Sequence, residues 1–210
     1  MFNIYNYYYN WWKNIDKLIL ILILSLFFLG LFFSLVSTSL IASDKLNTNS
    51  YYFFMKHFIF ILFGISILTT LSFLDQKKLL DICLIIFIPL FICLVLVPLI
   101  GVEVKGSRRW IDFPFLPRFQ PIELLKPFFI VLISTILAFE GKKKIYSKYL
   151  ISSLVLVVVI LFLIAQPDIG QTLLITMTWL SLIFISGINL FIFFSFFIFI
   201  GSILSYMIFF

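Results

Sequence analysis

Residues 18–41 read LILILILSLFFLGLFFSLVSTSLI, a run of 24 residues without a charged side chain. A helix needs ~20 mostly apolar residues to cross the hydrocarbon core of a bilayer, which is about 30 Å thick, because each residue rises about 1.5 Å. The run is also longer than the ~7 to 15 apolar residues at the core of a signal peptide. We predict that it is an uncleaved transmembrane helix.

The same apolar pattern repeats along the chain, which has 210 residues, is 63% hydrophobic and carries only 11% charged residues. An average soluble domain has roughly 25% charged residues. Further apolar runs lie at about 53–74, 82–100, 121–139, 149–165, 171–186 and 191–210. Lipid offers the backbone no hydrogen-bond partners, so each run is predicted to be helical. We predict an all-α integral membrane protein in which residues 1–210 form a single transmembrane domain of about seven helices.

The last apolar run reaches Phe210 without polar closing residues. We therefore expect the sequence to be a truncated, N-terminal portion of a larger bundle.

Lysine and arginine residues predict the orientation, because cytoplasmic segments of membrane proteins are enriched in them. With a cytoplasmic N-terminus, the inner segments hold eight: Lys13, Lys17, Lys77, Lys78, Lys142, Lys143, Lys144 and Lys148. The outer segments hold seven: Lys45, Lys56, Lys105, Arg108, Arg109, Arg118 and Lys126. Five of these seven lie in residues 101–127, and without them the ratio is eight to two. We predict a cytoplasmic N-terminus, with 101–127 as an outer basic loop and the start of the fourth span; the inverted orientation is the alternative.

The net charge of +6 does not indicate nucleic-acid binding, because the basic residues fall in short gaps between apolar runs. One histidine and two separated cysteines do not make a His/Cys metal site. The sequence leaves open whether a divalent cation is required.

All three arginines, Arg108, Arg109 and Arg118, lie within eleven residues, whereas lysines are spread along the chain. Guanidinium groups form bidentate hydrogen bonds with phosphate. We predict that this loop binds an anionic headgroup at the outer face, with Trp110 among the aromatic residues that anchor it. Binding of ordinary anionic phospholipid is the alternative.

Two further sites carry charge close to the membrane. Glu123 and Lys126 are three residues apart, so they share a helix face and can neutralise each other; a structural salt bridge and a ligand role both remain open. Asp168 follows Pro167 in the sequence QPDIGQ, between two apolar runs. It is predicted to cap the next helix, with contact to substrate or metal as the alternative.

Three motifs, KGSRRWID (105–112), RFQPIELLKP (118–127) and AQPDIGQ (165–171), occur in this order and on these spans. The chain resembles the SEDS family (shape, elongation, division and sporulation) in all three. KGSRRW and the proline after Lys126 make it more similar to the division branch, FtsW, than to the elongation branch, RodA. The resemblance covers essentially the whole chain but only about the first half of a family member.

The resemblance implies a peptidoglycan glycosyltransferase of the bacterial inner membrane that polymerises lipid II for the division septum. It implies that Arg118, Glu123, Lys126 and Asp168 line the lipid-substrate cavity, with Lys105, Arg108, Arg109, Trp110 and Gln120 in the same motifs. It also implies a class b penicillin-binding protein and other division proteins as membrane partners. The chain departs from the family pattern at Ile122, where a small residue is usual.

The family's catalytic aspartate is expected beyond Phe210, so no catalytic residue is assigned in this chain, and we expect it to be inactive alone. Two other functions remain: a flippase or carrier for a lipid-linked precursor, and a noncatalytic membrane subunit of the division complex.

Overall fold

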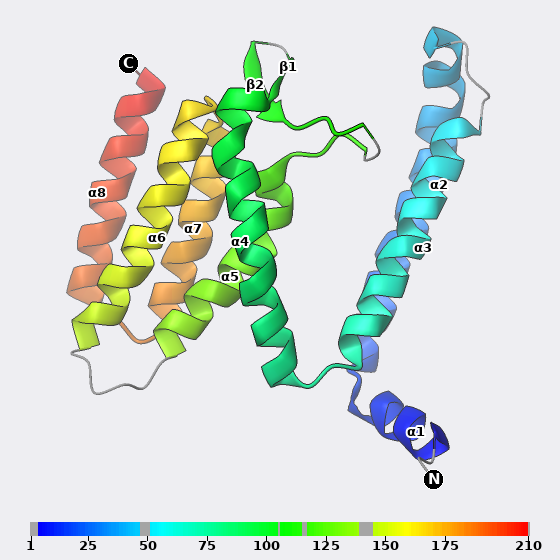
Figure 1. Ribbon diagram of the computed structural model, residues 1–210, viewed down its shortest axis with the longest axis horizontal. Helices are drawn as coiled ribbons and strands as arrows, with labels where there is room; N and C mark the ends of the chain where they lie inside the picture. The colour runs from blue at the N-terminus through cyan, green and yellow to red at the C-terminus, as the bar shows by residue number, and fades with distance from the viewer. Residues whose placement is uncertain (1–3, 47–50, 105, 115–116, 139–144, 210) are drawn as a thin grey trace. The chain divides into compact units, whose positions relative to one another are not determined.

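The computed structural model describes residues 4–46, 51–104, 106–114, 117–138 and 145–209 (Figure 1). These residues form two compact units, Met1–Leu79 and Leu80–Phe210. The first unit contains three helices: α1 (Ile4–Asn14), α2 (Lys17–Leu46) and α3 (Tyr52–Ser72). The second contains most of α4 (Gln76–Ile100), strands β1 (Val102–Val104) and β2 (Ser107–Trp110), and helices α5 (Pro121–Ala138), α6 (Ile145–Ala165), α7 (Ile169–Ile185) and α8 (Leu190–Phe209).

Over the described residues, each predicted apolar run falls on one helix and extends at most two residues past its end, which confirms the all-α membrane fold. Among the described residues, five helical segments are long and apolar enough to cross a membrane: Lys17–Val36, Tyr52–Ser72, Gln76–Ile100, Pro121–Ala138 and Ser147–Ala165. α7 is apolar but has 17 residues. α4 begins six residues before the apolar run predicted at 82–100. These additional residues, QKKLLD, include four polar or charged side chains, so hydropathy alone did not mark them as part of the helix.

The first unit consists of α1 and the hairpin of α2 and α3. α2 and α3 pack along each other, and two glycines lie where they meet: a Cβ at Gly30 would lie 3.5 Å from the His57 ring and one at Gly64 would lie 4.0 Å from Phe27, both ordinary contact distances. The sequence did not predict α1 as a helix. Its Trp11 donates from Nε1 to Ser72 Oγ (2.9 Å) and stacks on Phe73 with ring centroids 4.5 Å apart.

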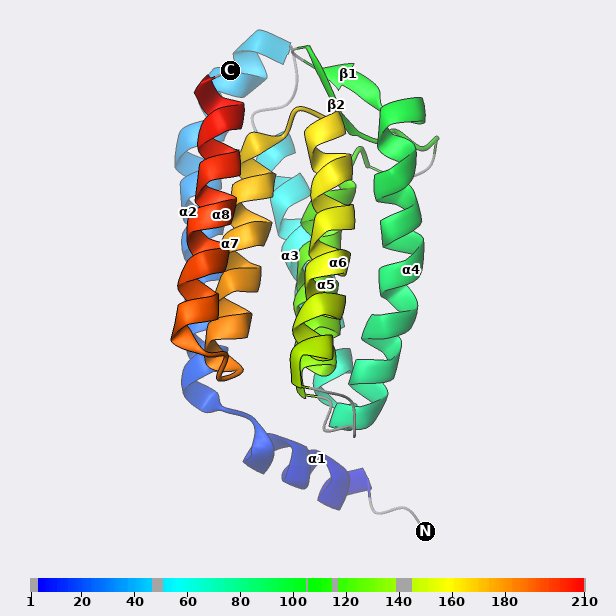
Figure 2. The ribbon, with the colours of Figure 1, turned by 90° about the vertical axis from the view of Figure 1, so that its left-hand side faces the viewer.

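The second unit is an up-and-down bundle in which α4 to α8 alternate in direction (Figure 2). α7 packs against α5, α6 and α8, and α5 packs against α6. Fully buried residues such as Phe129 on α5, Leu163 on α6 and Trp179 on α7 form one apolar core, to which α4 contributes Leu94. The hairpin and the α6–α7 turn lie at the same end of this bundle in both views.

The basic loop contains a β-hairpin that the sequence analysis missed. β1 pairs antiparallel with β2, with Glu103 opposite Arg108 and Val102 opposite Trp110. Gly106 adopts φ +79° in the turn, a conformation that suits glycine. Ile111 and Phe119 then exchange two backbone hydrogen bonds of 3.0 and 3.2 Å. These bonds close the loop between them and bring its two ends together just before α5.

Gly101 joins α4 to the hairpin. Its amide donates to the Val97 carbonyl (2.8 Å), and a Cβ at this position would lie only 2.3 Å from that oxygen. The junction therefore requires glycine.

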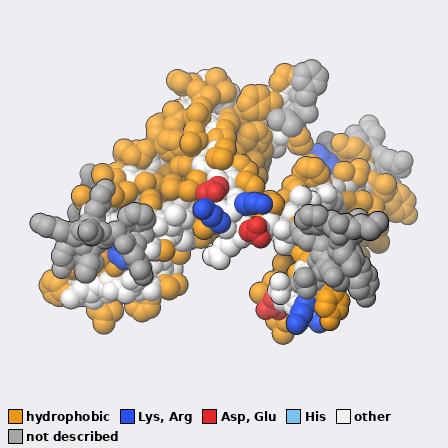
Figure 3. All heavy atoms as spheres, turned by 60° about the horizontal axis from the view of Figure 1, so that its bottom comes forward, with side chains coloured by type: hydrophobic (Ala, Val, Ile, Leu, Met, Phe, Trp, Pro, Cys, Tyr) orange, Lys and Arg blue, Asp and Glu red, His pale blue; other side chains and the backbone are white. Residues whose placement is uncertain are grey.

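Many large apolar side chains are exposed, for example Phe191 (82%) and Ile185 (78%). The face in Figure 3, seen from the end opposite the hairpin, is mostly hydrophobic, with few Lys, Arg, Asp and Glu side chains. Such a surface is expected for helices that face lipid.

Candidate functional site

Arg109, on β2, reaches the end of α6. Its Nε donates to the carbonyl of Gln166 (3.4 Å), its Nη2 donates to the carbonyl of Pro167, and its Nη1 lies 3.7 Å from Asp168 Oδ1. The last carbonyls of a helix lack amide partners and carry the negative end of the helix dipole, so a cation is favoured there. Arg109 thus ties the hairpin to the α6–α7 turn through all three guanidinium nitrogens.

Asp168 lies in the α6–α7 turn and has a side chain only 7% exposed. Its Oδ1 accepts from the backbone amide of Gln171 (3.4 Å), so it caps α7 as predicted. Its Oδ2 accepts from Gln120 Nε2 (2.7 Å), just before α5. One carboxylate therefore connects the hairpin, the start of α5 and the start of α7.

Glu123 and Lys126 form the predicted ion pair in the first two turns of α5, with Oε2 and Nζ 2.7 Å apart. Gln171 of α7 bridges the pair: it accepts from Lys126 Nζ (3.1 Å) and donates to Glu123 Oε1. Lys126 is 17% exposed and Glu123 is 49% exposed. α5 has 18 residues and so a length of about 27 Å, less than the roughly 30 Å of a hydrocarbon core. To cross such a core, the helix would have to carry its first turns, and this pair with them, into the membrane.

The other two arginines have exposed acidic partners. Arg118 binds Asp112 across the closed loop, with both Nε (3.3 Å) and Nη2 (2.8 Å) on one carboxylate oxygen. Arg108 lies 3.8 Å from Glu103, its partner across the hairpin. All four side chains are roughly half exposed, and pairs of this kind contribute about 0 to 1 kcal/mol.

The structure therefore brings five of the nine predicted residues into one hydrogen-bonded network. We call this the turn network; its members are Arg109, Gln120, Glu123, Lys126 and Asp168, together with Gln166 and Gln171. Arg108, Trp110 and Arg118 lie on the hairpin and closed loop, and within the described part of the chain no hydrogen bond or ion pair links their side chains to this network. Lys105 lies outside the described residues.

Gln166 and Gln171 were not predicted. The spacing of Asp168 and Gln171 matches a capping box, in which a residue three positions after the cap faces back toward it, and this signal could have identified Gln171. For Gln166, whose partner is on α4, the sequence holds no local signal.

The charges within the turn network balance, because Arg109 and Lys126 are matched by Asp168 and Glu123. Lys126 retains capacity for a ligand: an ammonium group has three donors, and described residues engage it through Glu123 and Gln171. Arg118 likewise has five N–H donors, and its hydrogen bonds to Asp112 use Nε and Nη2. Both residues can therefore donate to an additional anion.

Among the described residues, no three His, Cys, Asp or Glu side chains gather in a way that could hold a metal ion. The structure thus adds no ligand set for a divalent cation within that part of the chain.

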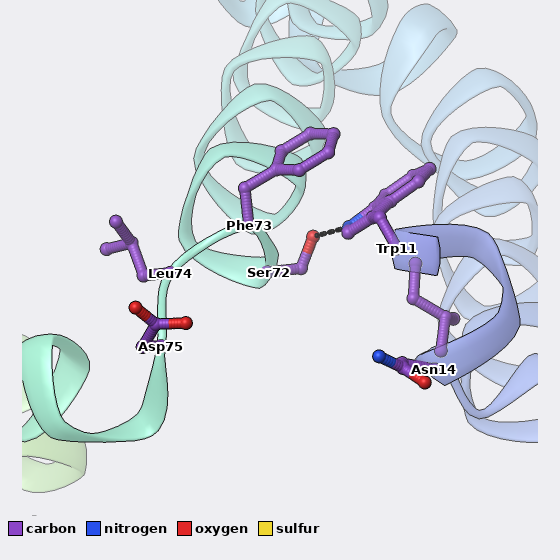
Figure 4. A pocket seen from close by; sticks show the side chains of 7 residues that line it. Trp11, Asn14, Ser72, Phe73, Leu74 and Asp75 are labelled. Atoms are coloured by element: carbon purple, nitrogen blue, oxygen red, sulfur yellow. Dashed lines mark hydrogen bonds between the residues drawn. The ribbon is translucent and has the colours of Figure 1, made fainter. Parts of the chain in front are cut away.

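A cleft of about 320 Å³ in the first unit is lined by Trp11, Asn14, Ile15, Ser72, Phe73, Leu74 and Asp75. Figure 4 shows the Trp11 indole pointing to the Ser72 hydroxyl at one wall of this cleft. A second cleft, beside α5 and α7, is lined by Ser134, Leu137, Ala138, Leu182, Ile185 and Ser186. Neither cleft contains a predicted site residue.

Comparison with known proteins gives three findings. The family model described as cell cycle protein, for FtsW, RodA and SpoVE, matches residues 16–210. A probable peptidoglycan glycosyltransferase FtsW of Coxiella burnetii is 31% identical over 179 residues, which are 83% of this chain and 48% of the relative. The corresponding protein of Idiomarina loihiensis is 31% identical over 192 residues, covering 87% of this chain and 45% of the relative. The chain therefore spans about half the length of these relatives.

Solved structures share the fold. The crystal structure of the rod shape determining protein RodA of Thermus thermophilus superimposes with a TM-score of 0.58 at 22% identity, covering 76% of this chain and 54% of RodA. A chain of a peptidoglycan synthase complex gives a TM-score of 0.57 at 22% identity, covering 75% of this chain and 47% of that one.

Proposed function

From the premise that the chain belongs to the cell cycle protein family of FtsW, RodA and SpoVE, we propose that it forms the N-terminal part of a peptidoglycan glycosyltransferase. The apolar helices and the family indicate a multi-pass inner-membrane protein. The proposed substrate is lipid II, and the proposed setting is wall synthesis at the division septum. The names of the relatives from Coxiella burnetii and Idiomarina loihiensis support the reaction class.

The observation that carries the proposal is the turn network, which joins three family motifs through contacts between residues 48 to 59 positions apart. Two of its ionisable groups, Glu123 and Lys126, lie in the first two turns of α5, and we place them near the outer boundary of the membrane. A lipid-linked pyrophosphate carries its negative charge at this depth. Ionisable side chains in the membrane cost free energy, and those that occur there commonly mark a functional site. The network is therefore suited to bind the headgroup of a polyprenyl pyrophosphate.

We assign different roles to the basic residues. Lys126 and Arg118 are proposed to contact the pyrophosphate, because both retain donors. Arg109 is proposed to position the hairpin, because its three nitrogens already meet protein acceptors. Arg108, Trp110 and Lys105 are proposed to contribute charge and anchoring at the outer face. A class b penicillin-binding protein is the proposed partner, and the structure of a peptidoglycan synthase complex among the neighbours is consistent with it.

Lipid II binding by this chain in nanodiscs tests the assignment. We expect Lys126→Ala and Arg118→Ala each to weaken binding about tenfold or more, since one charge-assisted hydrogen bond contributes ~1.5 to 3 kcal/mol. The control is Lys77→Ala with Lys78→Ala, which removes two charges at the start of α4, the other end of that helix from the hairpin. Unchanged affinity in both site variants, or an equal loss in the control, would contradict the assignment.

A further inference from the structure

Gln166 is a buried side chain with an unusual partner. It is 1% exposed and donates from Nε2 to the backbone carbonyl of Leu94 on α4 (3.2 Å). Its Oε1 accepts no hydrogen bond from any residue that the structure describes. A flipped amide would set two oxygens against each other, so the Leu94 carbonyl fixes the orientation of the group. The side chain of Gln166 therefore acts through its Nε2 donor.

The Leu94 carbonyl needs a donor because of Pro98. In an α-helix each carbonyl accepts from the amide four residues later, and Pro98 has no N–H and lies inside α4. Leu94 is 0% exposed, so the carbonyl belongs to a buried residue, and an unpaired buried carbonyl is destabilising. In a membrane such a carbonyl must find a partner within the protein.

We propose that Gln166 is a positioning residue that supplies the hydrogen-bond donor missing at Pro98 and so joins the last turn of α4 to the α6–α7 turn. The backbone carbonyl of the same residue accepts from Arg109, and Asp168 follows two residues later. Gln166 therefore fixes the turn from the α4 side, while Arg109 fixes it from the hairpin. The arrangement goes beyond the proposed function and does not depend on it.

A second proline in α4 provides a matched control. Pro89 removes the amide that would bind the carbonyl of Ile85, but Ile85 is 68% exposed. Among the described residues, no side-chain donor is recorded for the Ile85 carbonyl. Replacing Pro89 should therefore change helix propensity without changing the need for Gln166.

A double-mutant cycle tests the proposal. Gln166→Met is similar in size and lacks the donor; we expect it to lower the midpoint of thermal unfolding by about 2 to 12 °C, the shift for one lost buried hydrogen bond in a chain of this size. In a Pro98→Ala background, the amide of the introduced alanine can donate to the Leu94 carbonyl, so Gln166→Met should lower the midpoint by less than half as much. In a Pro89→Ala background, Gln166→Met should lower the midpoint by the full amount. If Gln166→Met folds only with Pro98→Ala, the proposal is supported; an equal loss in all three backgrounds overturns it.

Distance measurements separate positioning from stability. Spin labels at Leu99 and Ile169, which are 74% and 40% exposed, report the separation of the α4 end and the α7 start in a cysteine-free variant. We expect Pro98→Ala alone to leave the distance distribution narrow, because the carbonyl can still accept from Gln166. Pro98→Ala with Gln166→Met should broaden it even though stability has returned. A narrow distribution in that double variant would overturn the positioning role.

Discussion

Asp168 combines a local and a long-range role in one carboxylate. It caps α7 through the amide of Gln171, and it also accepts from Gln120 and pairs with Arg109. The cap requires only an acceptor, whereas the pair with Arg109 requires the negative charge. Substitutions that preserve one property and remove the other can therefore separate the two roles.

Asp168→Asn keeps a capping acceptor but removes the charge, so we expect a loss of about 1 to 2 kcal/mol in unfolding free energy. Asp168→Ala also removes the cap, which contributes ~1 kcal/mol, and it leaves Arg109 and Gln120 without this partner. We therefore expect Asp168→Ala to lower the unfolding free energy by about 2 to 4 kcal/mol. Thermal unfolding in detergent measures both. Equal losses in the two variants would show that only one of the roles exists.

At the residue level, local relations could be predicted and distant ones could not. The Glu123–Lys126 pair follows from helical spacing, and the Asp168 cap follows from its place after Pro167; both are confirmed. Arg109 lies 59 positions before Asp168, and no periodicity relates them. The sequence suggested that the three arginines bind one ligand together. In the structure Arg109 is bound to the α6–α7 turn, whereas Arg108 and Arg118 have exposed acidic partners.

At the level of elements, the hairpin between α4 and α5 determines where the basic residues lie. Its strands have three and four residues and include Glu103, Arg108 and Arg109, so neither apolar alternation nor length marks them as strands. The helices were predicted because each one is a long apolar run. α1 was missed because its 11 residues mix Tyr, Trp and Asn, a composition that also suits an irregular interfacial segment.

The α4–hairpin junction can be tested at Gly101. Gly101→Ala would place a Cβ 2.3 Å from the Val97 carbonyl oxygen, and since a backbone atom must move, we expect a loss of about 1 to 3 kcal/mol. Gly201→Ala is the matched control, because its Cβ would meet no atom of the described residues within 4 Å in α8 and alanine is the better helix former, by ~1 kcal/mol. The thermal midpoint should fall for Gly101→Ala and should stay the same or rise for Gly201→Ala. A fall in both variants would show that the contact with the Val97 carbonyl is not the cause.

For the whole molecule, the account depends on which face of the membrane carries the hairpin. Within the second unit the hairpin and the α6–α7 turn share one end, and Ser147, at the start of α6, belongs to the other end of that helix. We propose that the hairpin end faces outward, where lipid II would be polymerised.

Thiol labelling tests the orientation after Cys83 and Cys93 are replaced. We expect a cysteine at Ser107 to react with an impermeant maleimide in intact cells, and one at Ser147 to react only after permeabilisation. The reverse pattern would place the hairpin in the cytoplasm and remove the basis for a site that meets lipid II at the outer face.

Polymerisation of lipid II tests the central claim most directly. The assay compares this chain with the same chain joined to the second half of an FtsW relative, such as that of Coxiella burnetii. The account predicts glycan strands only from the joined protein, and a loss of at least tenfold when Lys126 is replaced by alanine. Glycan synthesis by the 210-residue chain alone, or by the joined protein equally well without Lys126, would contradict it.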